Sequence, residues 1–166
     1  MKFKYLIFLI FLYNSTFSQE KLNTFEIYKK DKIHYKKSDN NVFTGIAEFK
    51  RKNGHIVFEE FYKDGYLTKY VIYYNLDIQI VSTEILYYDK SENKKTKTEF
   101  SSVENERKEI THYDSNGKKT LNEIYKKNIL IYSCEYLNNK KHGKEFCITD
   151  NGDLNTEYFE NGKRLK

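Results

Sequence analysis

Two stretches of the chain, Gly45-IAEFKRK-Asn53-Gly54-HIVFEEFYK-Asp64-Gly65-YL and Gly143-KEFCITD-Asn151-Gly152-DLNTEYFE-Asn161-Gly162-KRL, follow the same pattern. They share three glycines, an Asn or Asp before two of these glycines, and an aromatic pair before the last turn. Asn-Gly and Asp-Gly supply the two positive φ angles of a type I′ turn at little steric cost, so each dipeptide predicts a two-residue hairpin connection. The chain is therefore interpreted as a repeat of β-hairpins.

Turn signals continue along the whole chain, roughly every ten to thirteen residues. They are Lys30-Asp31, Ser38 to Asn41, Asn53-Gly54, Asp64-Gly65, Asn75 to Asp77, Ser91 to Asn93, Glu104 to Glu106, Asn116-Gly117, Lys127-Asn128, Asn138-Asn139, Asn151-Gly152 and Asn161-Gly162. The glycines expected to shape turns are Gly45, Gly54, Gly65, Gly117, Gly143, Gly152 and Gly162. Short aromatic and β-branched segments between regular turns predict an all-β, elongated antiparallel meander of stacked hairpins, as a single sheet or an open roll.

The composition supports strands and gives little information about partners. The 166 residues include sixteen tyrosines and twelve phenylalanines but no proline, and aromatic residues favour strands. The formal charge is +5, and no dense cluster of Lys and Arg follows the pattern of a phosphate-binding surface. We therefore expect no nucleic-acid partner. Residues 90–106 contain few large apolar side chains and are expected to form short strands or a mobile loop.

The first eighteen residues have the pattern of a secretory signal peptide. Lys2 and Lys4 give a basic start, residues 5–13 are an apolar run, and Thr16-Phe17-Ser18 places small residues at the two positions that a signal peptidase reads. A membrane-spanning helix needs roughly 20 apolar residues, which is more than this run offers. We expect cleavage between Ser18 and Gln19, export to the periplasm or the medium, and a single repeat domain over residues 19–166.

The alternation of side chains predicts which residues share a face. With a two-residue turn at Asp64-Gly65, Ile56, Phe58, Glu60 and Tyr62 should face Tyr73, Val71, Lys69 and Leu67 on one side of the sheet. Sixty-three residues later, Lys119, Leu121, Glu123 and Tyr125 should face Tyr136, Cys134, Tyr132 and Leu130 on that same side. The opposite face varies between the copies. It would carry the candidate binding residues Phe61, Tyr66, Tyr70 and Tyr74.

Several of these motifs resemble the bacterial variant of the MORN repeat. The resemblance rests on residues 42–45, Asn53-Gly54 and residues 61–67, and again on residues 136–143 and 158–163, and it covers roughly residues 25–166. Thr68-Lys69 lacks the glycine that usually follows the Gly-x-Leu element. The resemblance implies an elongated sheet of stacked hairpins used for contacts with proteins or, in some members, with membrane surfaces. Some bacterial relatives are labelled antitoxins.

The sequence contains no catalytic constellation, and we expect neither a metal site nor a cofactor. The four histidines, His34, His55, His112 and His142, are scattered singly and are interpreted as ordinary surface or turn residues. Neither a Gly-x-Ser-x-Gly elbow nor a glycine-rich phosphate loop occurs. Neighbouring carboxylates such as Glu59 and Glu60 alternate across the pleat and cannot meet.

Both cysteines occupy positions where the repeat places apolar residues. Cys134 aligns with Val71 and Cys147 with Phe49, so core packing is expected. Export would permit a disulfide. A tight Asn138-Asn139 turn would pair Cys134 with Gly143 and leave Cys147 about 13 Å along the strand, out of bridging range. Free thiols are therefore favoured.

Taken together, these features favour an exported, non-enzymatic binding or scaffold module that contacts another protein through a sheet face. The alternative is an antitoxin or immunity protein that neutralises a cognate toxin.

Overall fold

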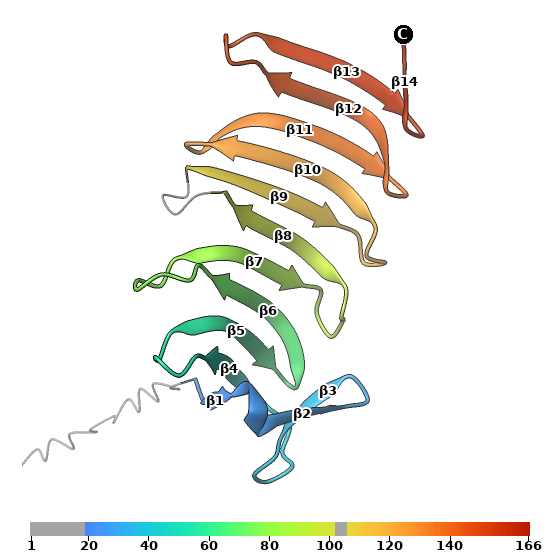
Figure 1. Ribbon diagram of the computed structural model, residues 1–166. Coiled ribbons are helices and arrows are strands. Elements are labelled where there is room, and N and C mark those ends of the chain that lie inside the picture. The colour runs from blue at the N-terminus through green and yellow to red at the C-terminus, as the bar shows by residue number, and fades with distance from the viewer. Residues whose placement is uncertain (1–18, 102–105) are drawn as a thin grey trace, which may run out of the picture.

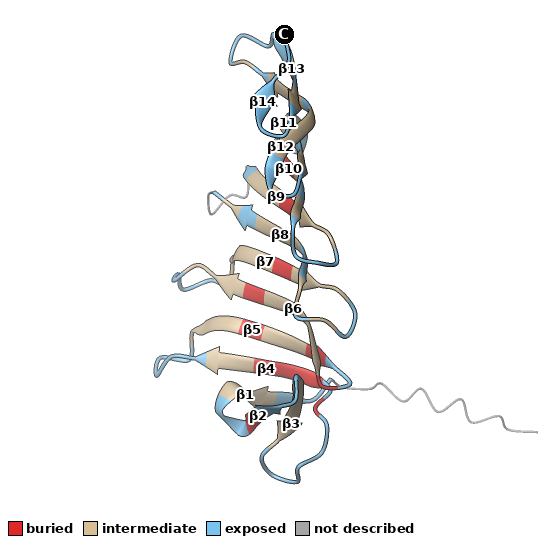
Figure 2. Ribbon diagram, turned by 90° about the vertical axis from the view of Figure 1, so that its right-hand side faces the viewer, coloured by how far each residue is buried: buried red, intermediate tan, exposed pale blue. Residues whose placement is uncertain are grey.

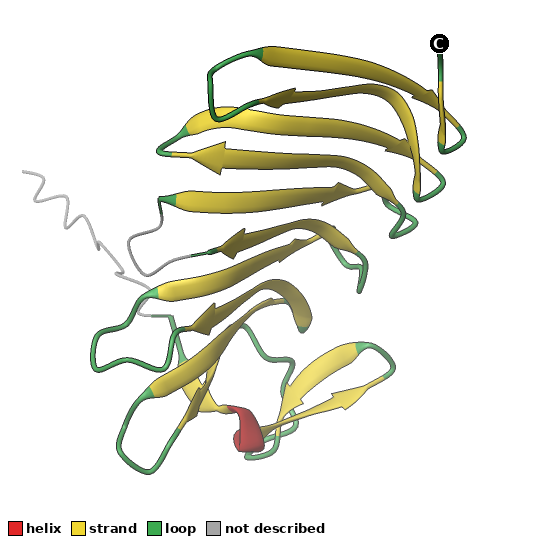
Figure 3. Ribbon diagram, turned by 45° about the horizontal axis from the view of Figure 1, so that its top comes forward, coloured by secondary structure: helices red, strands yellow, loops and turns green. Residues whose placement is uncertain are grey.

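The computed structural model describes residues 19–101 and 106–166, so the predicted signal peptide and most of the turn expected at Glu104 to Glu106 lie outside the described residues. The described chain forms a ladder of antiparallel strands (Figure 1). The only helical element in these two ranges is the 3₁₀ turn η1 (Thr24–Glu26), which Figure 3 shows beside hairpin β2–β3. The fold is therefore the predicted all-β meander in an open sheet.

The strands follow one another across the sheet in nearly the order of the sequence. They are β1 (Lys21–Asn23), β4 (Gly45–Lys50), β5 (Ile56–Lys63), β6 (Tyr66–Tyr73), β7 (Val81–Tyr87), β8 (Lys94–Phe100), β9 (Arg107–Tyr113), β10 (Lys119–Lys126), β11 (Ile129–Leu137), β12 (Lys140–Ile148), β13 (Leu154–Glu160) and β14 (Lys163–Arg164). The first pair, β1 with β4, is parallel. Strands β2 (Ile27–Lys30) and β3 (Ile33–Lys36) form a separate hairpin. Residues 90–106, expected to form short strands or a mobile loop, contain the seven-residue strand β8.

The Asn-Gly and Asp-Gly turns occur where predicted but only partly with the predicted type, and the expectation of turns at Gly45 and Gly143 is wrong, because these glycines pair within strands β4 and β12. Asp64 and Gly65 both have positive φ, 50° and 77°, as a type I′ turn requires. At Asn53-Gly54 only the glycine has positive φ, 85°, and its N–H donates to the Arg51 carbonyl at 2.9 Å. This is a type I turn closed by a left-handed glycine, which gives a longer loop than the predicted two-residue connection.

The expected register is wrong because strand β6 contains a β-bulge. Tyr62 pairs with Leu67 as predicted, but Phe61 pairs with Lys69, so Thr68 is an extra residue. The remaining pairs of this hairpin are displaced by one position, and Val71 lies opposite Glu59 instead of Phe58. A one-residue displacement moves side chains to the other face.

The same displacement recurs in the hairpin of β10 and β11. Tyr125 pairs with Leu130, but Ile124 pairs with Tyr132 and Asn122 with Cys134. The predicted pairs of Leu121 with Cys134 and Glu123 with Tyr132 do not form, because Ile131 is the extra residue here.

Two faces of the sheet can be defined, because residues that pair on neighbouring strands point to the same side. One row runs through Glu59, Val71, Glu84, Thr98, Ile110 and Glu123, and its side is called the Val71 face. The next row runs through Glu60, Tyr70, Ile85, Lys97, Thr111 and Asn122, and its side is called the Tyr70 face.

The two copies related by sixty-three residues do not share a face, contrary to the prediction. Tyr62 lies two residues after Glu60, on the Tyr70 face, whereas Tyr125 lies two residues after Glu123, on the Val71 face. The sixty-three-residue spacing relates strand β5 to strand β10. These strands are an odd number of positions apart in an antiparallel sheet, so the two copies run in opposite directions (Figure 1).

Burial is concentrated at the end of the sheet that carries hairpin β2–β3 (Figure 2). There Ile27, Phe43, Ala47 and Tyr62 form a buried cluster. The ring of Tyr62 lies 5.5 Å from that of Phe43. The hairpin and the segment that follows it thus cover the sheet over β4 and β5, and they give this end a core that a single sheet layer lacks.

The two cysteines are free thiols, as favoured from the sequence. Cys134 is buried and pairs with Glu145, and Cys147 pairs with Tyr132. The expected pairing of Cys134 with Gly143 is wrong, because the register of β11 with β12 shifts between Cys134 and Tyr136. Cys147 is therefore two positions from the residue opposite Cys134, and not four.

Candidate functional site

A cavity of about 270 Å³ lies where hairpin β2–β3 meets the Tyr70 face. The hairpin contributes Lys29, Lys32 and His34 to its wall. Strands β5, β6 and β7 contribute Glu60, Tyr62, Tyr66, Leu67 and Tyr87, and the turn after β7 contributes Ser91 and Glu92. The cavity thus joins residues that are far apart in the sequence and combines aromatic rings with a few polar groups, as ligand sites do.

Gly65 is the point at which the hairpin attaches to the sheet. Its carbonyl accepts the His34 N–H at 2.9 Å, and its own N–H donates to the Phe43 carbonyl at 2.9 Å. A Cβ at this position would overlap the side chain of Ile33. Glycine is therefore required here both for the positive φ of the turn and for the close approach of the hairpin. Lys29 and Glu92, which also line the cavity, form an ion pair with each other.

Glu60 is the acidic group inside the cavity. Its Oε2 atom accepts the Tyr62 hydroxyl at 3.0 Å. Burial raises the pKa of the Glu60 carboxyl, although the hydrogen bond from Tyr62 opposes this shift. Burial, together with the charge of Glu60, also raises the pKa of Tyr70 and of Tyr87. The hydroxyls of Tyr70 and Tyr87 therefore stay protonated near neutral pH.

His34 lies against the ring of Tyr62, with the ring centroids 4.6 Å apart. Its Nδ1 atom is 3.0 Å from the Gly65 carbonyl oxygen. Burial lowers the pKa of the imidazole, and the hydrogen bond to Gly65 raises it by less. His34 thus lines the cavity and is held in place by Tyr62 and Gly65, whereas the sequence suggested an ordinary surface or turn residue.

The structure does not bring the four candidate binding residues together. Tyr66 lines the cavity. Tyr70 lies nearby on the Tyr70 face, with its ring 5.3 Å from that of Phe58. Phe61 lies on the opposite, Val71 face under the ammonium group of Lys69, and Tyr74 follows β6 and donates its hydroxyl to the Phe100 carbonyl. The prediction that all four residues share one face is wrong, because the bulge at Thr68 places Tyr70 on the face opposite to Phe61.

Sequence reasoning missed most of the cavity wall. Lys29 and Lys32 only flank the turn signal Lys30-Asp31, and Tyr87 belongs to no motif in the sequence. Only the docking of hairpin β2–β3 on the sheet brings them together. No periodicity in the sequence reports such a long-range contact.

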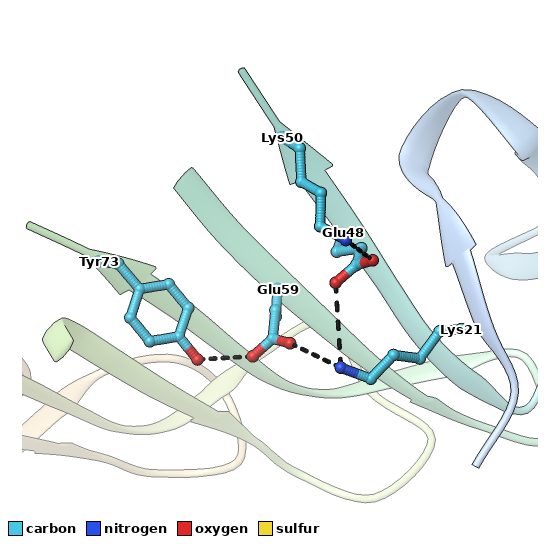
Figure 4. Close-up of polar contacts among 5 residues, drawn as sticks. All are labelled: Lys21, Glu48, Lys50, Glu59 and Tyr73. Carbon is cyan, nitrogen blue, oxygen red and sulfur yellow. Dashed lines mark hydrogen bonds and ion pairs between the residues drawn. The ribbon is translucent and has the colours of Figure 1, made fainter. Parts of the chain in front are cut away.

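A second polar cluster lies on the Val71 face near the same end of the sheet (Figure 4). Glu48 and Glu59 are directly paired across β4 and β5. The Lys21 ammonium lies 3.9 Å from Glu48 and 3.6 Å from Glu59, and the Tyr73 hydroxyl donates to Glu59 at 2.5 Å. Burial and the bond to Glu59 raise the pKa of Tyr73 to about 12. Lys21 offsets the repulsion of two carboxylates, so this cluster fastens β1 to the sheet.

Comparisons of the chain with protein-family models, with curated proteins and with solved structures give no match, so the resemblance to the MORN variant stays a prediction. Within residues 19–101 and 106–166, no three His, Cys, Asp or Glu side chains gather in a way that could hold a metal ion. The same ranges contain no helix with the length and apolar character to cross a membrane.

Proposed function

We propose that this protein is an exported, non-enzymatic binding module that contacts another protein through the Tyr70 face beside the hairpin cavity. The observation that carries the proposal is the pair of half-buried tyrosines Tyr66 and Tyr87 that line an open cavity, with the half-buried Tyr70 on the sheet face. Tyrosine combines a large apolar area with a polar tip and loses little conformational entropy, which suits it to protein contacts.

The architecture supports this proposal. In the described part of the chain, the main sheet contains every strand except β2 and β3, so β6 and β7 belong to a single layer. The cavity makes a defined recess in this otherwise open surface. A partner could insert one side chain into the recess and lay the rest of its surface over the neighbouring rings.

The test is partner capture with immobilised residues 19–166 in an extract of the producing cells. The variant carries Tyr66→Ser and Tyr87→Ser, and the control carries Tyr125→Ser, which removes a tyrosine of the Val71 face. We expect the parent and the control to capture the same proteins and the double variant to lose them while its circular dichroism spectrum stays unchanged. Equal capture by the folded double variant would contradict the proposal. A toxin among the captured proteins would favour the immunity role.

A further inference from the structure

The polar interior of the hairpin cavity offers hydrogen-bond acceptors. Glu60 Oε2 already accepts the Tyr62 hydroxyl at 3.0 Å, whereas Oε1 has no donor among the described residues. The carboxylate therefore keeps acceptor capacity toward the cavity, because an ionised carboxylate offers about four lone-pair positions.

His34 adds a second acceptor. A carbonyl oxygen only accepts hydrogen bonds, so the contact with Gly65 requires that Nδ1 carries the proton. The lowered pKa keeps the ring neutral near pH 7. In this tautomer Nε2 has a lone pair and no hydrogen.

The aromatic wall completes the environment. The rings of Tyr62, Tyr66 and Tyr87 contribute to the lining, and the face of an aromatic ring attracts a cation within about 6 Å. Of the two lysines at the wall, Lys29 is paired with Glu92, and Lys32 is an exposed turn residue whose charge water screens. The lining would repel an anion, because the Glu60 carboxylate is negative and the faces of the aromatic rings are electron-rich.

We propose that the cavity binds an alkylammonium group, with Glu60 and His34 as acceptors and the tyrosine rings around its carbon chain. An ammonium has three donors and no acceptor, which complements a lining of acceptors. The cavity volume of about 270 Å³ has room for a group the size of a lysine side chain. The inference rests on the proposed function, because it names the group of the partner that enters the recess. A lysine side chain and a free amine share this chemistry.

The experiment is a titration of ¹⁵N-labelled residues 19–166 with n-butylammonium chloride at pH 8, followed by NMR chemical shifts. Neutral n-butanol, which has the same chain length, is the ligand control. We expect n-butylammonium to shift the amides of His34, Tyr62 and Tyr66 and to bind at least ten-fold more tightly than n-butanol. Equal binding of the two ligands, or an absence of shifts with n-butylammonium, would overturn the inference.

Two variants of the chain make the assignment specific. Glu60→Gln should weaken n-butylammonium binding at least ten-fold. Glu123→Gln should leave it unchanged, because Glu123 also bonds to a tyrosine two residues away, Tyr125, but lies on the Val71 face. Unchanged binding to Glu60→Gln would overturn the inference.

A capped tripeptide with a central lysine distinguishes the two sources of the ammonium group. Tighter binding of the tripeptide than of n-butylammonium supports a lysine of a protein partner, and weaker binding supports a free amine. The titration uses no partner protein, so it can succeed when the capture experiment fails, and the two proposals are tested separately.

Discussion

Thr68 donates its hydroxyl to the backbone carbonyl of Phe61 at 3.0 Å. Thr68 is the extra residue of the bulge in β6, and its side chain satisfies a carbonyl beside the interrupted ladder. Ser82 does the same in β7, where its hydroxyl donates to the Ile72 carbonyl at 3.1 Å beside a second bulge. At these two bulges a short hydroxyl side chain thus stabilises the position at which the register changes.

Replacing Thr68 by valine tests this relationship. Thr68→Val keeps the shape but removes the donor, so we expect a loss of about 1 kcal/mol in the free energy of unfolding, measured by urea denaturation. Thr120→Val, at an exposed threonine, is the control and should change stability by less than about 0.5 kcal/mol. Equal losses in both variants would show that the hydroxyl of Thr68 has no special role.

The glycine turns should differ in their tolerance of a side chain. Gly152 has a φ of 88° and open space around its Cβ position, so Gly152→Ala should cost about 1 kcal/mol from backbone strain alone. Gly65→Ala adds an overlap with Ile33 and should cost about 3 kcal/mol in all. Thermal and urea unfolding of the two variants measure the difference. If Gly65→Ala is no worse than Gly152→Ala, the hairpin does not approach the sheet at Gly65 as described.

Tyr62 is a core residue, because only 3% of its surface is exposed. Tyr62→Ala should therefore cost about 3 to 5 kcal/mol. Tyr158 is 54% exposed, and Tyr158→Ala should change stability by about 0.5 kcal/mol or less. Similar effects of the two substitutions would contradict the packing of hairpin β2–β3 against Tyr62.

Stability should depend on pH through Glu60. Its pKa in the folded chain is raised, so folding favours the protonated carboxyl, and this stabilising contribution is lost as the pH rises through the folded pKa. Glu60→Gln removes the charge, so its melting temperature relative to that of the parent should be higher at pH 8 than at pH 4. Melting curves across this range check the sign. A difference that is constant with pH would contradict it.

The cluster around Lys21 should show energetic coupling. Lys21→Met removes the ammonium that lies between Glu48 and Glu59 and leaves the Lys50 ion pair on Glu48, so we expect a lower stability at low salt. A double-mutant cycle with Glu59→Gln should give a coupling energy of about 1 kcal/mol between Lys21 and Glu59. Additive effects of the two substitutions would show that the ion pair contributes nothing measurable.

Local signals predicted the ladder well, and long-range contacts limited the rest. Positive φ at Asp64 and Gly65 is a property of a dipeptide, so the turn could be read directly from the sequence. The bulge at Thr68 could not, because a threonine within a strand gives no sign that it will leave the ladder. That one residue moved Tyr70 to the side of Tyr62 and separated it from Phe61. The cavity wall was beyond prediction, since Lys29 meets Glu92 only after the hairpin docks.

The uneven burial along the sheet has a consequence for biosynthesis. Ribosomes make the chain from its N-terminus, and the buried cluster from Ile27 to Tyr62 is complete before β7 is synthesised. The first part of the ladder can therefore acquire a core once it has emerged from the ribosome or the export channel, before the rest of the chain follows. Each later strand then adds to the free edge of a sheet that already exists, so its pairing partner is the strand made just before it. Each strand thus pairs with one that is close to it in the sequence and was made just before it. Such local pairing favours rapid folding with few wrongly paired strands.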